Sequence, residues 1–385
     1  MQNKIPEGWE KVELVEVCSL VTDGTHDKTP LVSKEKGVPL VTSKDLTECG
    51  VCFDDVLYIT KEQHKQIIKR SKPEKGDLLY SKIGTIGKPT IVDVDFEFSI
   101  KNVALFKLKK ELIISKYLKL YLSSNEVNSY LNKIAGGGNQ KFIPLNQLKK
   151  LVIILPPIST QQKIVSILEK VEKAKEMRKE ADELTKDFLK AVFMEMFGDE
   201  ANIQQVELSQ ATEIIMGQSP PGDSYNENAA GTPFFQGKAE FTERYPVVKK
   251  WTTQPSKMAK PNSVLMSVRA PVGSVNVCNI DCCIGRGLAS IRPKEKLTLE
   301  FLFSALQTME EKIANLGTGS TFKAITSEQL KTLKIPLPPL SLQQRFASIV
   351  KEVEQLKEQQ KQSKEQIDNL FNALMQKAFK GELVE

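Results

Sequence analysis

The chain carries the same helix-opening sequence twice. Residues 155–165 read LPPISTQQKIV, and residues 337–347 read LPPLSLQQRFA, 182 positions later. Aligning 148–164 with 330–346 gives 10 identities in 17 positions. Two copies are too few for a solenoid, which needs at least about three repeats to bury a continuous core. The sequence therefore predicts an internal pair, in which a globular unit and a helix are followed by a second unit and a second helix.

The correspondence between the halves continues upstream of the prolines. Residues 137–143 and 319–325 share a glycine, a lysine and an isoleucine at the same offset. The stretch KGDLLYSKIGTIG (75–87) also resembles PNSVLMSVRAPVG (261–273). These matches support two related globular units.

Each double proline predicts the end of a strand and the start of a long helix, because proline cannot donate to a backbone ladder. Ser159 and Ser341 then occupy an N-cap position, each with a glutamine three residues later, which is the spacing of a capping box. No glycine or proline follows before Gly198 and Gly381. Each helix can therefore reach about 55 Å at ~1.5 Å per residue.

Both expected helices carry a heptad pattern. The predicted a and d positions of the first are Ile164, Ile167, Val171, Ala174, Arg178, Ala181, Thr185, Phe188 and Val192. Those of the second are Phe346, Ile349, Val353, Leu356, Gln360, Ser363, Ile367, Leu370 and Leu374. Such a seam is too long for one small domain to cover, and a coiled coil with another chain would cost association entropy. We therefore expect the two helices to pack on each other in antiparallel fashion.

Composition indicates a soluble intracellular protein, which we place in the cytoplasm. The longest apolar run, LVIIL at 151–155, is far too short to span a bilayer. The N-terminal sequence MQNKIPEGWE has no apolar segment typical of a signal peptide. Six cysteines in 385 residues do not form a disulfide framework and suit a reducing compartment.

Positive charge is concentrated in the globular halves. Residues 159–200 and 341–385 together carry 15 basic and 17 acidic groups, a net charge of −2, whereas the whole chain carries +6. The globular halves therefore sum to +8. Two mildly basic units joined by a nearly neutral spacer fit a protein that contacts duplex DNA at two separate places.

Signatures of catalysis are missing from the sequence. There is no N/D-P-P-Y/F/W motif of the kind with which amino-methyltransferases hold a flipped base. The glycines at 136–138 follow a helical pattern, so they do not open a dinucleotide or S-adenosylmethionine fold. GTIGKPT at 84–90 is no Walker A loop, because Lys82 stands where glycine is needed and Pro89 where serine or threonine is needed. We expect no catalytic residue and no cofactor in this chain.

Metal binding is not expected either. Cys49 and Cys52 have zinc-like spacing, but the other cluster, Cys278 with Cys282 and Cys283, lies in the other half. The two histidines, at positions 26 and 64, share no repeat partner and suit a surface or DNA-contacting role better than catalysis.

Polar and basic residues on expected loops are the candidates for DNA contact, because base edges are read by donors and acceptors and phosphates by lysine and arginine. The candidates of the first half are Thr25, His26, Lys28, Ser43, Lys44, Ser81, Lys82, Asn139 and Lys141. Those of the second half are Gln218, Ser219, Tyr225, Gln236, Lys238, Ser267, Arg269 and Lys323. Arg269 is the residue most readily placed against guanine, since one guanidinium can bond O6 and N7 together.

The order of these segments resembles HsdS, the specificity subunit of type I restriction–modification enzymes. The resemblance rests on the paired L-P-P-x-S-x-Q-Q helix openings and covers essentially the whole chain. PEGW at 6–9, DGTH at 23–26 and GQSPP at 217–221 also resemble openings of the family's target recognition domains.

The resemblance implies two mixed α/β target recognition domains in a pseudo-two-fold arrangement, separated by two long antiparallel coiled-coil helices. The boundaries expected are 1–158 and 201–340 for the recognition domains, with 159–200 and 341–385 for the spacer helices. It implies a split duplex DNA target, with one half-site for each domain. It also implies docking of two methyltransferase subunits and of restriction–translocase subunits. S-adenosylmethionine, ATP and Mg²⁺ are then expected in those partners rather than in this chain.

Two other interpretations remain open at this stage. The chain could be a self-contained DNA methyltransferase or nuclease whose active site has no familiar motif. It could also be a coiled-coil scaffold with no role in nucleic-acid binding.

Overall fold

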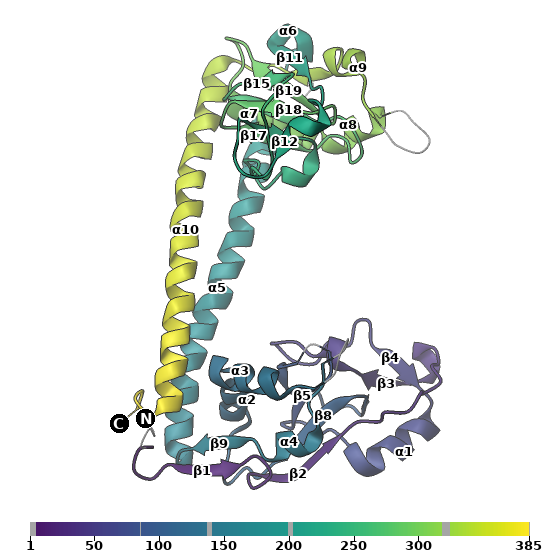
Figure 1. The fold of residues 1–385 in the computed structure, drawn as a ribbon, viewed down its shortest axis with the longest axis vertical. Coiled ribbons are helices and arrows are strands. Elements are labelled where there is room, and N and C mark those ends of the chain that lie inside the picture. Colours follow the sequence, from purple (N-terminus) through teal and green to yellow (C-terminus); the bar gives the residue numbers. More distant parts are fainter. Residues whose placement is uncertain (1–4, 85, 137–140, 199–202, 318–323, 385) are drawn as a thin grey trace. The chain divides into compact units, whose positions relative to one another are not determined.

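The computed structural model describes residues 5–84, 86–136, 141–198, 203–317 and 324–384 (Figure 1). The chain divides into two compact units. The first unit is Met1–Met177 with Ser363–Glu385, and the second unit is Arg178–Gln362. Both boundaries fall inside long helices, so each unit combines one globular part with half of each helix. No helix in the described ranges is both long and apolar enough to cross a membrane.

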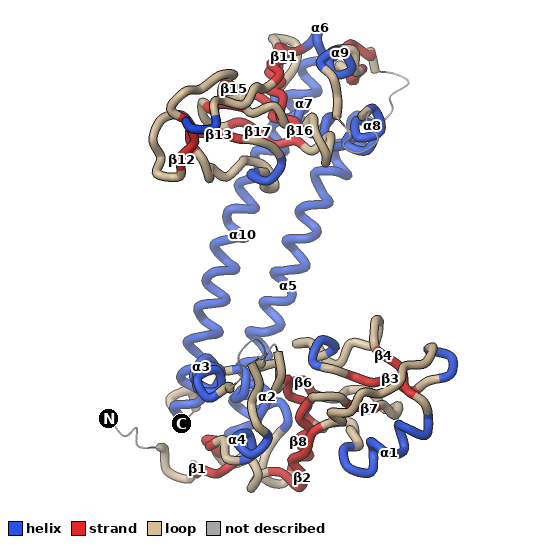
Figure 2. Tube along the Cα trace, turned by 45° about the vertical axis from the view of Figure 1, so that its right-hand side comes forward, coloured by secondary structure: helices blue, strands red, loops and turns tan. Residues whose placement is uncertain are grey.

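The first unit is built around mainly antiparallel strands (Figure 2). One sheet has the strand order β2-β8-β5-β6, a second has the order β4-β3-β7 with β3 and β7 parallel, and β1 pairs with β9. The strands are β1 (Glu10–Glu13), β2 (Cys18–Asp23), β3 (Val38–Val41), β4 (Leu57–Ile59), β5 (Leu78–Ser81), β6 (Pro89–Ile91), β7 (Ser99–Ile100), β8 (Val103–Leu108) and β9 (Val152–Leu155). The helices are η1 (Lys34–Lys36), η2 (Ser43–Asp45), α1 (Lys61–Ser71), α2 (Ser115–Ser123), α3 (Asn125–Ile134), α4 (Leu145–Lys149) and the start of α5 (Ile158–Phe197).

The second unit has the same plan. One sheet has the order β11-β19-β16-β17, a second has the order β12-β14-β13-β18-β15, and β10 pairs with β20. The strands are β10 (Gln205–Glu207), β11 (Thr212–Met216), β12 (Tyr225–Asn226), β13 (Thr232–Phe235), β14 (Trp251–Thr252), β15 (Met258–Ala259), β16 (Ser263–Ser267), β17 (Val275–Cys278), β18 (Cys282–Ile284), β19 (Leu288–Pro293) and β20 (Lys334–Pro336). The helices are α6 (Leu208–Ala211), η4 (Gly222–Ser224), η5 (Lys238–Glu240), α7 (Leu299–Thr308), α8 (Glu310–Leu316), α9 (Ser327–Lys331) and α10 (Leu340–Lys380).

One inner strand of each four-stranded sheet is buried on both faces. In β5, Leu78 and Tyr80 belong to one hydrophobic core of the first unit, while Leu79 belongs to the other. In β16, Val264 and Met266 face one core of the second unit and Leu265 faces the other. Successive side chains of a strand point to opposite faces, so a strand covered on both sides reads as a continuous apolar run.

The first glutamine of each repeated pair makes the same set of hydrogen bonds in both copies. Gln161 accepts from Ile114 N at 2.9 Å and donates to Leu112 O at 2.9 Å and Pro156 O at 2.8 Å. Its counterpart, Gln343, accepts from Thr298 N at 2.8 Å and donates to the carbonyl oxygens of Lys296 at 3.1 Å and Pro338 at 2.8 Å.

Both glutamine side chains are fully buried. A buried backbone polar group without a partner is costly. Each amide therefore joins the start of a long helix to the segment that opens α2 or α7, and the repeat preserves this junction.

The two long helices run in opposite directions, as predicted. In the first unit the start of α5 (Ile164, Leu168) shares a core with the end of α10 (Met375, Ala378). In the second unit the end of α5 (Phe193, Phe197) shares a core with the start of α10 (Phe346, Val350). Figures 1 and 2 both show α5 and α10 side by side.

Polar contacts also cross between the two long helices inside each unit. In the second unit the buried Gln360 amide donates to Thr185 Oγ1 at 2.8 Å. In the first unit Lys175 pairs with Asp368 at 2.8 Å and lies over the ring of Phe371. The two mixed α/β folds and the antiparallel helices confirm the expected fold class.

The predicted heptad register is wrong at three positions. Phe188 and Leu370 are each 50% exposed and Leu356 is 45% exposed, although all three were assigned to the seam. Burial falls instead on residues one place later than the predicted ones, as at Leu168 and Val350. The physical reason is that apolar residues occur as adjacent pairs, such as Ile167-Leu168, Ile349-Val350, Phe188-Leu189 and Leu370-Phe371. Spacings of three or four then fit the pattern equally well.

The predicted N-caps are also wrong. The helices begin at Ile158 and Leu340, one residue before the expected serine caps. Pro157 O accepts from Thr160 N at 2.9 Å and from Gln161 N at 3.0 Å, and Pro339 O accepts from Leu342 N at 3.0 Å. A proline has no N–H to leave unsatisfied, so it can stand immediately before the first turn.

Candidate nucleic-acid interface

In the second unit the structure brings five predicted residues around one hollow. Ser219, Gln236, Lys238, Ser267 and Arg269 line a volume of about 230 Å³. They come from three segments that are far apart in sequence, and each segment follows or ends a strand: β11, β13 or β16. Gly237, Ala270, Arg286 and Gly287 complete the lining.

Glycines let the backbone segments of this hollow approach each other closely. A Cβ on Gly217 would lie 2.2 Å from Gly285 O, and a Cβ on Gly287 would lie 2.5 Å from Gln236 O. Real side chains do not tolerate such distances from backbone atoms, so these positions require glycine. Backbone hydrogen bonds fill the same gaps: Gly217 N donates to Leu288 O at 2.9 Å, and Gly285 N donates to Phe235 O at 2.8 Å.

The hollow is electropositive. Arg269 and Arg286 are exposed, and neither guanidinium has an acidic partner among the described residues. Lys238 lies 3.9 Å from Glu310, a loose contact, and Glu310 also accepts from Ser274 Oγ at 2.5 Å. Cations that are not neutralised by the protein attract anions and electron-rich base edges.

Two further candidates of the second unit lie beside the hollow rather than in it. Tyr225 donates its hydroxyl to Pro220 O at 2.9 Å and packs against Phe234 with a centroid distance of 4.8 Å, so its polar group holds the loop. Gln218 is exposed, and its backbone carbonyl oxygen accepts a hydrogen bond from Ser256 Oγ.

The equivalent place in the first unit is occupied by an ion-paired network around Asp23. Lys82 Nζ lies 2.6 Å from Asp23 Oδ2, and Arg70 donates to Asp23 Oδ1 at 2.8 Å. His26 Nε2 lies 2.9 Å from Asp23 Oδ2, and His26 Nδ1 lies 2.6 Å from Asn102 Oδ1. The network joins the end of β2, helix α1, the end of β5 and the turn before β8.

Asp23 is held in its charged form. Burial pushes the pKa of this carboxyl upward, but the hydrogen bonds and charges of Lys82 and His26 outweigh burial, so the pKa lies below its ordinary value. His26 and Arg70 remain about half exposed at 50% and 58% of their side chains, and they form the outer surface of the network.

Two of the predicted contact residues in the first unit lie beneath the surface. Ser81 is the last residue of β5 and is fully buried, and Lys82 is 5% exposed with its ammonium directed to Asp23. The sequence pattern placed both on an open loop. The structure corrects this, because β5 extends through Ser81 and the carboxylate that pairs with Lys82 lies 59 residues away in sequence.

The other candidates of the first unit lie nearer solvent. Lys28, Lys44 and Lys141 are exposed, while Thr25 and Ser43 are half-buried. Two of the predicted contact residues, Asn139 and Lys323, lie outside the described residues.

Sequence reasoning missed four residues of these sites: Asp23, Arg70, Asn102 and Arg286. In the sequence Asp23 stands out only as the first residue of the DGTH motif. Arg70 lies on a helix that holds none of the loop residues predicted to contact DNA. Asn102 has a positive φ of 59° and Arg286 stands between two glycines, so both turns carried a local signal.

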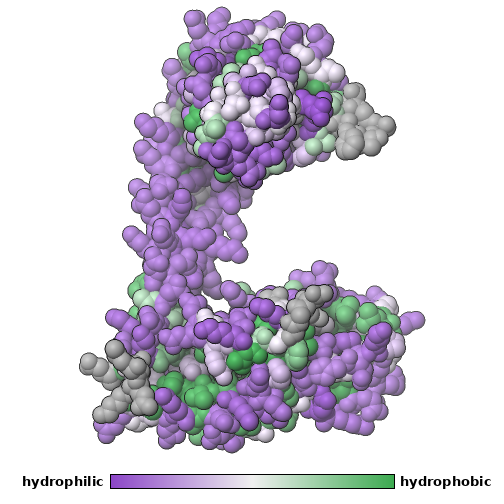
Figure 3. Space-filling model, in the orientation of Figure 1, coloured by the Kyte–Doolittle hydropathy of each residue, from purple (hydrophilic) through white to green (hydrophobic). Residues whose placement is uncertain are grey.

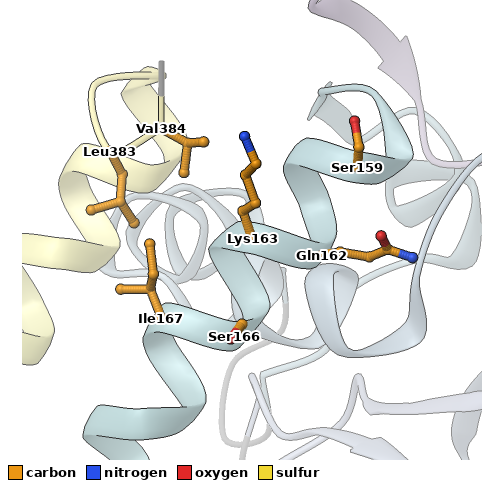
Figure 4. A pocket seen from close by; sticks show the side chains of 7 residues that line it. All are labelled: Ser159, Gln162, Lys163, Ser166, Ile167, Leu383 and Val384. Carbon is orange, nitrogen blue, oxygen red and sulfur yellow. The ribbon is translucent and has the colours of Figure 1, made fainter.

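A different hollow, of about 530 Å³, lies at the start of α5 in the first unit (Figure 4). Figure 4 shows Leu383 and Val384 of the C-terminal segment beside Ile167 and Lys163 of α5. None of the predicted DNA-contacting residues lines it. No group of three or more His, Cys, Asp or Glu side chains in the described ranges is arranged to hold a metal ion.

Comparison with known families decides what kind of protein carries these sites. A family model described as "Type I restriction modification DNA specificity domain" matches residues 6–186 and again residues 200–369. The chain belongs to this family.

Relatives of the chain are named as specificity subunits of type I restriction enzymes. A protein of Methanocaldococcus jannaschii named "Putative type I restriction enzyme MjaX specificity subunit" is 35% identical over 408 aligned positions, which cover 99% of this chain and 95% of that protein. The EcoKI specificity subunit of Escherichia coli is 22% identical, and the match covers 99% of this chain and 90% of that one.

Solved structures agree with this assignment. The crystal structure of the HsdS subunit from Thermoanaerobacter tengcongensis is 28% identical, with a TM-score of 0.54 and 99% of both chains covered. A chain from a study of assembly and conformational transition in the type I R-M system is 29% identical, with a TM-score of 0.73, covering 99% of this chain and 100% of that one.

Proposed function

We propose that this chain is the DNA specificity subunit of a type I restriction–modification complex, and that each unit reads one half of a split duplex target. The observation that carries the proposal is the duplicated scaffold, which presents polar and cationic side chains at the same strand ends in both copies. One chain with two readers of unlike side chains fits a target of two unlike half-sequences.

The residues proposed to contact DNA are those predicted from sequence, apart from the buried Ser81 and Lys82, together with the exposed Arg286. Lys238 and the exposed lysines Lys28, Lys44 and Lys141 suit phosphates, because lysine acts as a compact point charge. Arg269 suits a guanine edge. The proposed boundaries of the recognition domains stay at 1–158 and 201–340, with spacer helices at 159–200 and 341–385.

We assign no chemistry to this chain. In the proposal, methyl transfer from S-adenosylmethionine belongs to two methyltransferase subunits, and ATP- and Mg²⁺-dependent translocation and cleavage belong to restriction subunits. The family assignment favours this reading over a self-contained methyltransferase or nuclease. The working location of the complex is the cytoplasm.

The long helices offer docking surfaces for the partners. On the side that Figure 3 draws, the helices are mostly hydrophilic. Phe188 and Leu370 nevertheless stand at equivalent repeat positions, and each is 50% exposed. A single exposed apolar side chain is common on protein surfaces, so the docking proposal rests on the recurrence of the same position in both repeats. Two similar apolar positions suit two copies of one partner.

The test of the proposal is a methylome. The chain is expressed with its partner methyltransferase in a host that lacks other modification, and methylated sites are mapped by sequencing. We expect one split motif, and no methyl transfer or S-adenosylmethionine binding by the purified chain alone. Methyl transfer by the chain alone would favour the self-contained enzyme instead.

A length variant of α5 sharpens the test. Inserting four residues after Glu180 adds about 6 Å of helix at ~1.5 Å per residue. Base pairs repeat every ~3.4 Å along a strand, so the half-sites should move apart by about one or two base pairs while their sequences stay unchanged. An active variant with the original gap would show that the helix does not set the spacing.

A further inference from the structure

The turn between β18 and β19 presents a single side chain to the hollow of the second unit. The turn is Gly285-Arg286-Gly287. A Cβ on Gly285 would meet Gln236 Cα at 3.3 Å, and a Cβ on Gly287 would lie only 2.5 Å from Gln236 O. Gly287 has no room for a side chain and Gly285 has little room, so Arg286 is the residue of this turn that carries a side chain.

The turn is held firmly. Gly285 N donates to Phe235 O at 2.8 Å, and Leu288 N donates back to Gly285 O at 2.9 Å. Gly287 O accepts from Val268 N at 2.9 Å, which ties the turn to the segment that carries Arg269. A backbone fixed by two neighbouring segments and by a hydrogen bond of its own orients its side chain before a ligand arrives, which lowers the entropy cost of binding.

The corresponding turn of the first unit is one residue shorter, because only Lys101 and Asn102 stand between Ile100 and Val103, where Gly285, Arg286 and Gly287 stand between Ile284 and Leu288. Lys101 N donates to Val41 O at 2.8 Å, as Gly285 N does to Phe235 O, and Asn102 occupies the projecting position. Asn102 contacts His26, and the Arg286 N–H contacts Ser219, the residue that stands where His26 stands in the first unit. Both copies therefore open this turn with the same backbone hydrogen bond, but the turn of the second unit has one more residue and carries a different polar side chain.

The residues and the space around Arg286 indicate what kind of ligand it binds. Arg286 is exposed, it has no acidic partner among the described residues, and it shares the hollow with Arg269, Gln236 and Ser219. The volume of about 230 Å³ is below the ~300–1,000 Å³ usual for small-molecule sites. An open polar hollow with amide and hydroxyl groups beside two guanidinium groups is typical of base-edge recognition, in which arginine bonds guanine O6 and N7.

We infer that Arg286 is a specificity-determining residue that reads a guanine in the half-site contacted by the second unit. The inference rests on the proposed function and adds to it a residue and a base. Lys238, whose charge is partly offset by Glu310 at 3.9 Å, is left to position the phosphate backbone.

The experiment compares four forms of the chain in the reconstituted methyltransferase complex: the native form, Arg286→Ala, Arg286→Lys and Arg292→Ala. Arg292 is the matched control, because it is an exposed arginine of β19 that does not line the hollow. For each form the methylated motif is mapped, and binding to the native target is measured against salt concentration.

Arg286→Ala should relax a single guanine position of one half-site, with discrimination there falling roughly 5- to 150-fold, while the other half-site and the gap stay unchanged. Arg286→Lys should relax the same position, because lysine keeps the charge but cannot make the two parallel bonds. Arg292→Ala should leave the motif as it was.

The inference would be overturned if both Arg286 variants kept the native motif, bound all sequences more weakly to the same degree, and showed a salt slope lower by about 1. Arg286 would then be a phosphate contact. Recovery of the native motif by lysine would overturn it too. Thermal unfolding of each purified variant identifies any loss that comes from folding. If the native complex methylates no split motif, the proposed function fails rather than this assignment.

Discussion

The end of β2 in the first unit and the end of β11 in the second unit show how one backbone can serve two purposes. Gly24 N donates to Val103 O at 2.9 Å, and Gly217 N donates to Leu288 O at the same distance. Around Gly24 the side chains form a closed network on Asp23, with Lys82 buried. Around Gly217 they leave a hollow with exposed guanidinium groups.

One difference between the two sites is the residue before the glycine. Asp23 precedes Gly24, whereas Met216 precedes Gly217. A carboxylate at this buried position needs cations, and Lys82 and Arg70 supply them. A methionine needs none, so the cations of the second unit remain free for a ligand. Recognition surfaces can therefore diverge between copies while the hydrogen-bonded frame beneath them stays the same.

The strongest way to break this comparison is to remove the carboxylate. Asp23→Ala leaves the buried ammonium of Lys82 without its partner, and breaking a buried ion pair costs about 3–5 kcal/mol of unfolding free energy. Met216→Ala, the matched change in the second unit, should cost less, since only a half-buried apolar side chain is lost. Hydrogen exchange of β2, β5 and β8 measures the first effect, and exchange of β11, β16 and β19 measures the second. Equal losses would mean that the Asp23 network does not stabilise the first unit.

Changes at the repeated glutamines test the shared frame instead. Gln161→Ala and Gln343→Ala each leave buried backbone groups unsatisfied, at a cost of about 2–3 kcal/mol. Because both side chains make three equivalent hydrogen bonds, the two losses should agree within about 1 kcal/mol. Calorimetric unfolding of each variant checks this, with the exposed neighbours Gln162 and Gln344 as controls. A large difference between the two variants would show that the junctions are not equivalent.

Binding measurements separate the two kinds of cation in the second unit. Arg269→Ala should relax one base of one half-site at a cost of ~1–3 kcal/mol and leave the gap unchanged. Lys238→Ala should weaken binding to all sequences alike and lower the salt slope by about 1. Methylome mapping and titrations at several salt concentrations distinguish these results. A change of motif in the lysine variant would contradict the division into base and phosphate contacts.

The smallest effect is expected from acid. The folded-state pKa of Asp23 lies below its ordinary value, so its contribution is present above the unfolded pKa of ~3.9 and is lost as pH falls through the folded pKa. On acidification from pH 7, the strands around Asp23 should therefore lose more hydrogen-exchange protection than their counterparts around Met216. Asp23→Asn should remove that difference. Its persistence in the asparagine variant would assign the acid sensitivity to other carboxyl groups.

Local pattern was sufficient for the larger features of this protein. The duplicated L-P-P-x-S-x-Q-Q segment predicted two related units and two long helices, because proline, glycine and apolar spacing act within a few residues of chain. The apolar pattern could not predict which residues of each long helix are buried against the other helix. Adjacent apolar pairs such as Phe188-Leu189 fit two registers, and only packing against the partner helix decides which member is buried.

The candidate sites were also predictable from the sequence only in part. The sequence alone determined that polar and basic residues follow the strands of each half, and Ser219, Gln236, Lys238, Ser267 and Arg269 do meet around one hollow. Tertiary structure decided that Lys82 is buried and that Arg286 stands at the rim. The first outcome depends on a carboxylate 59 residues away, and the second on strands brought together by hydrogen bonds that no local pattern encodes.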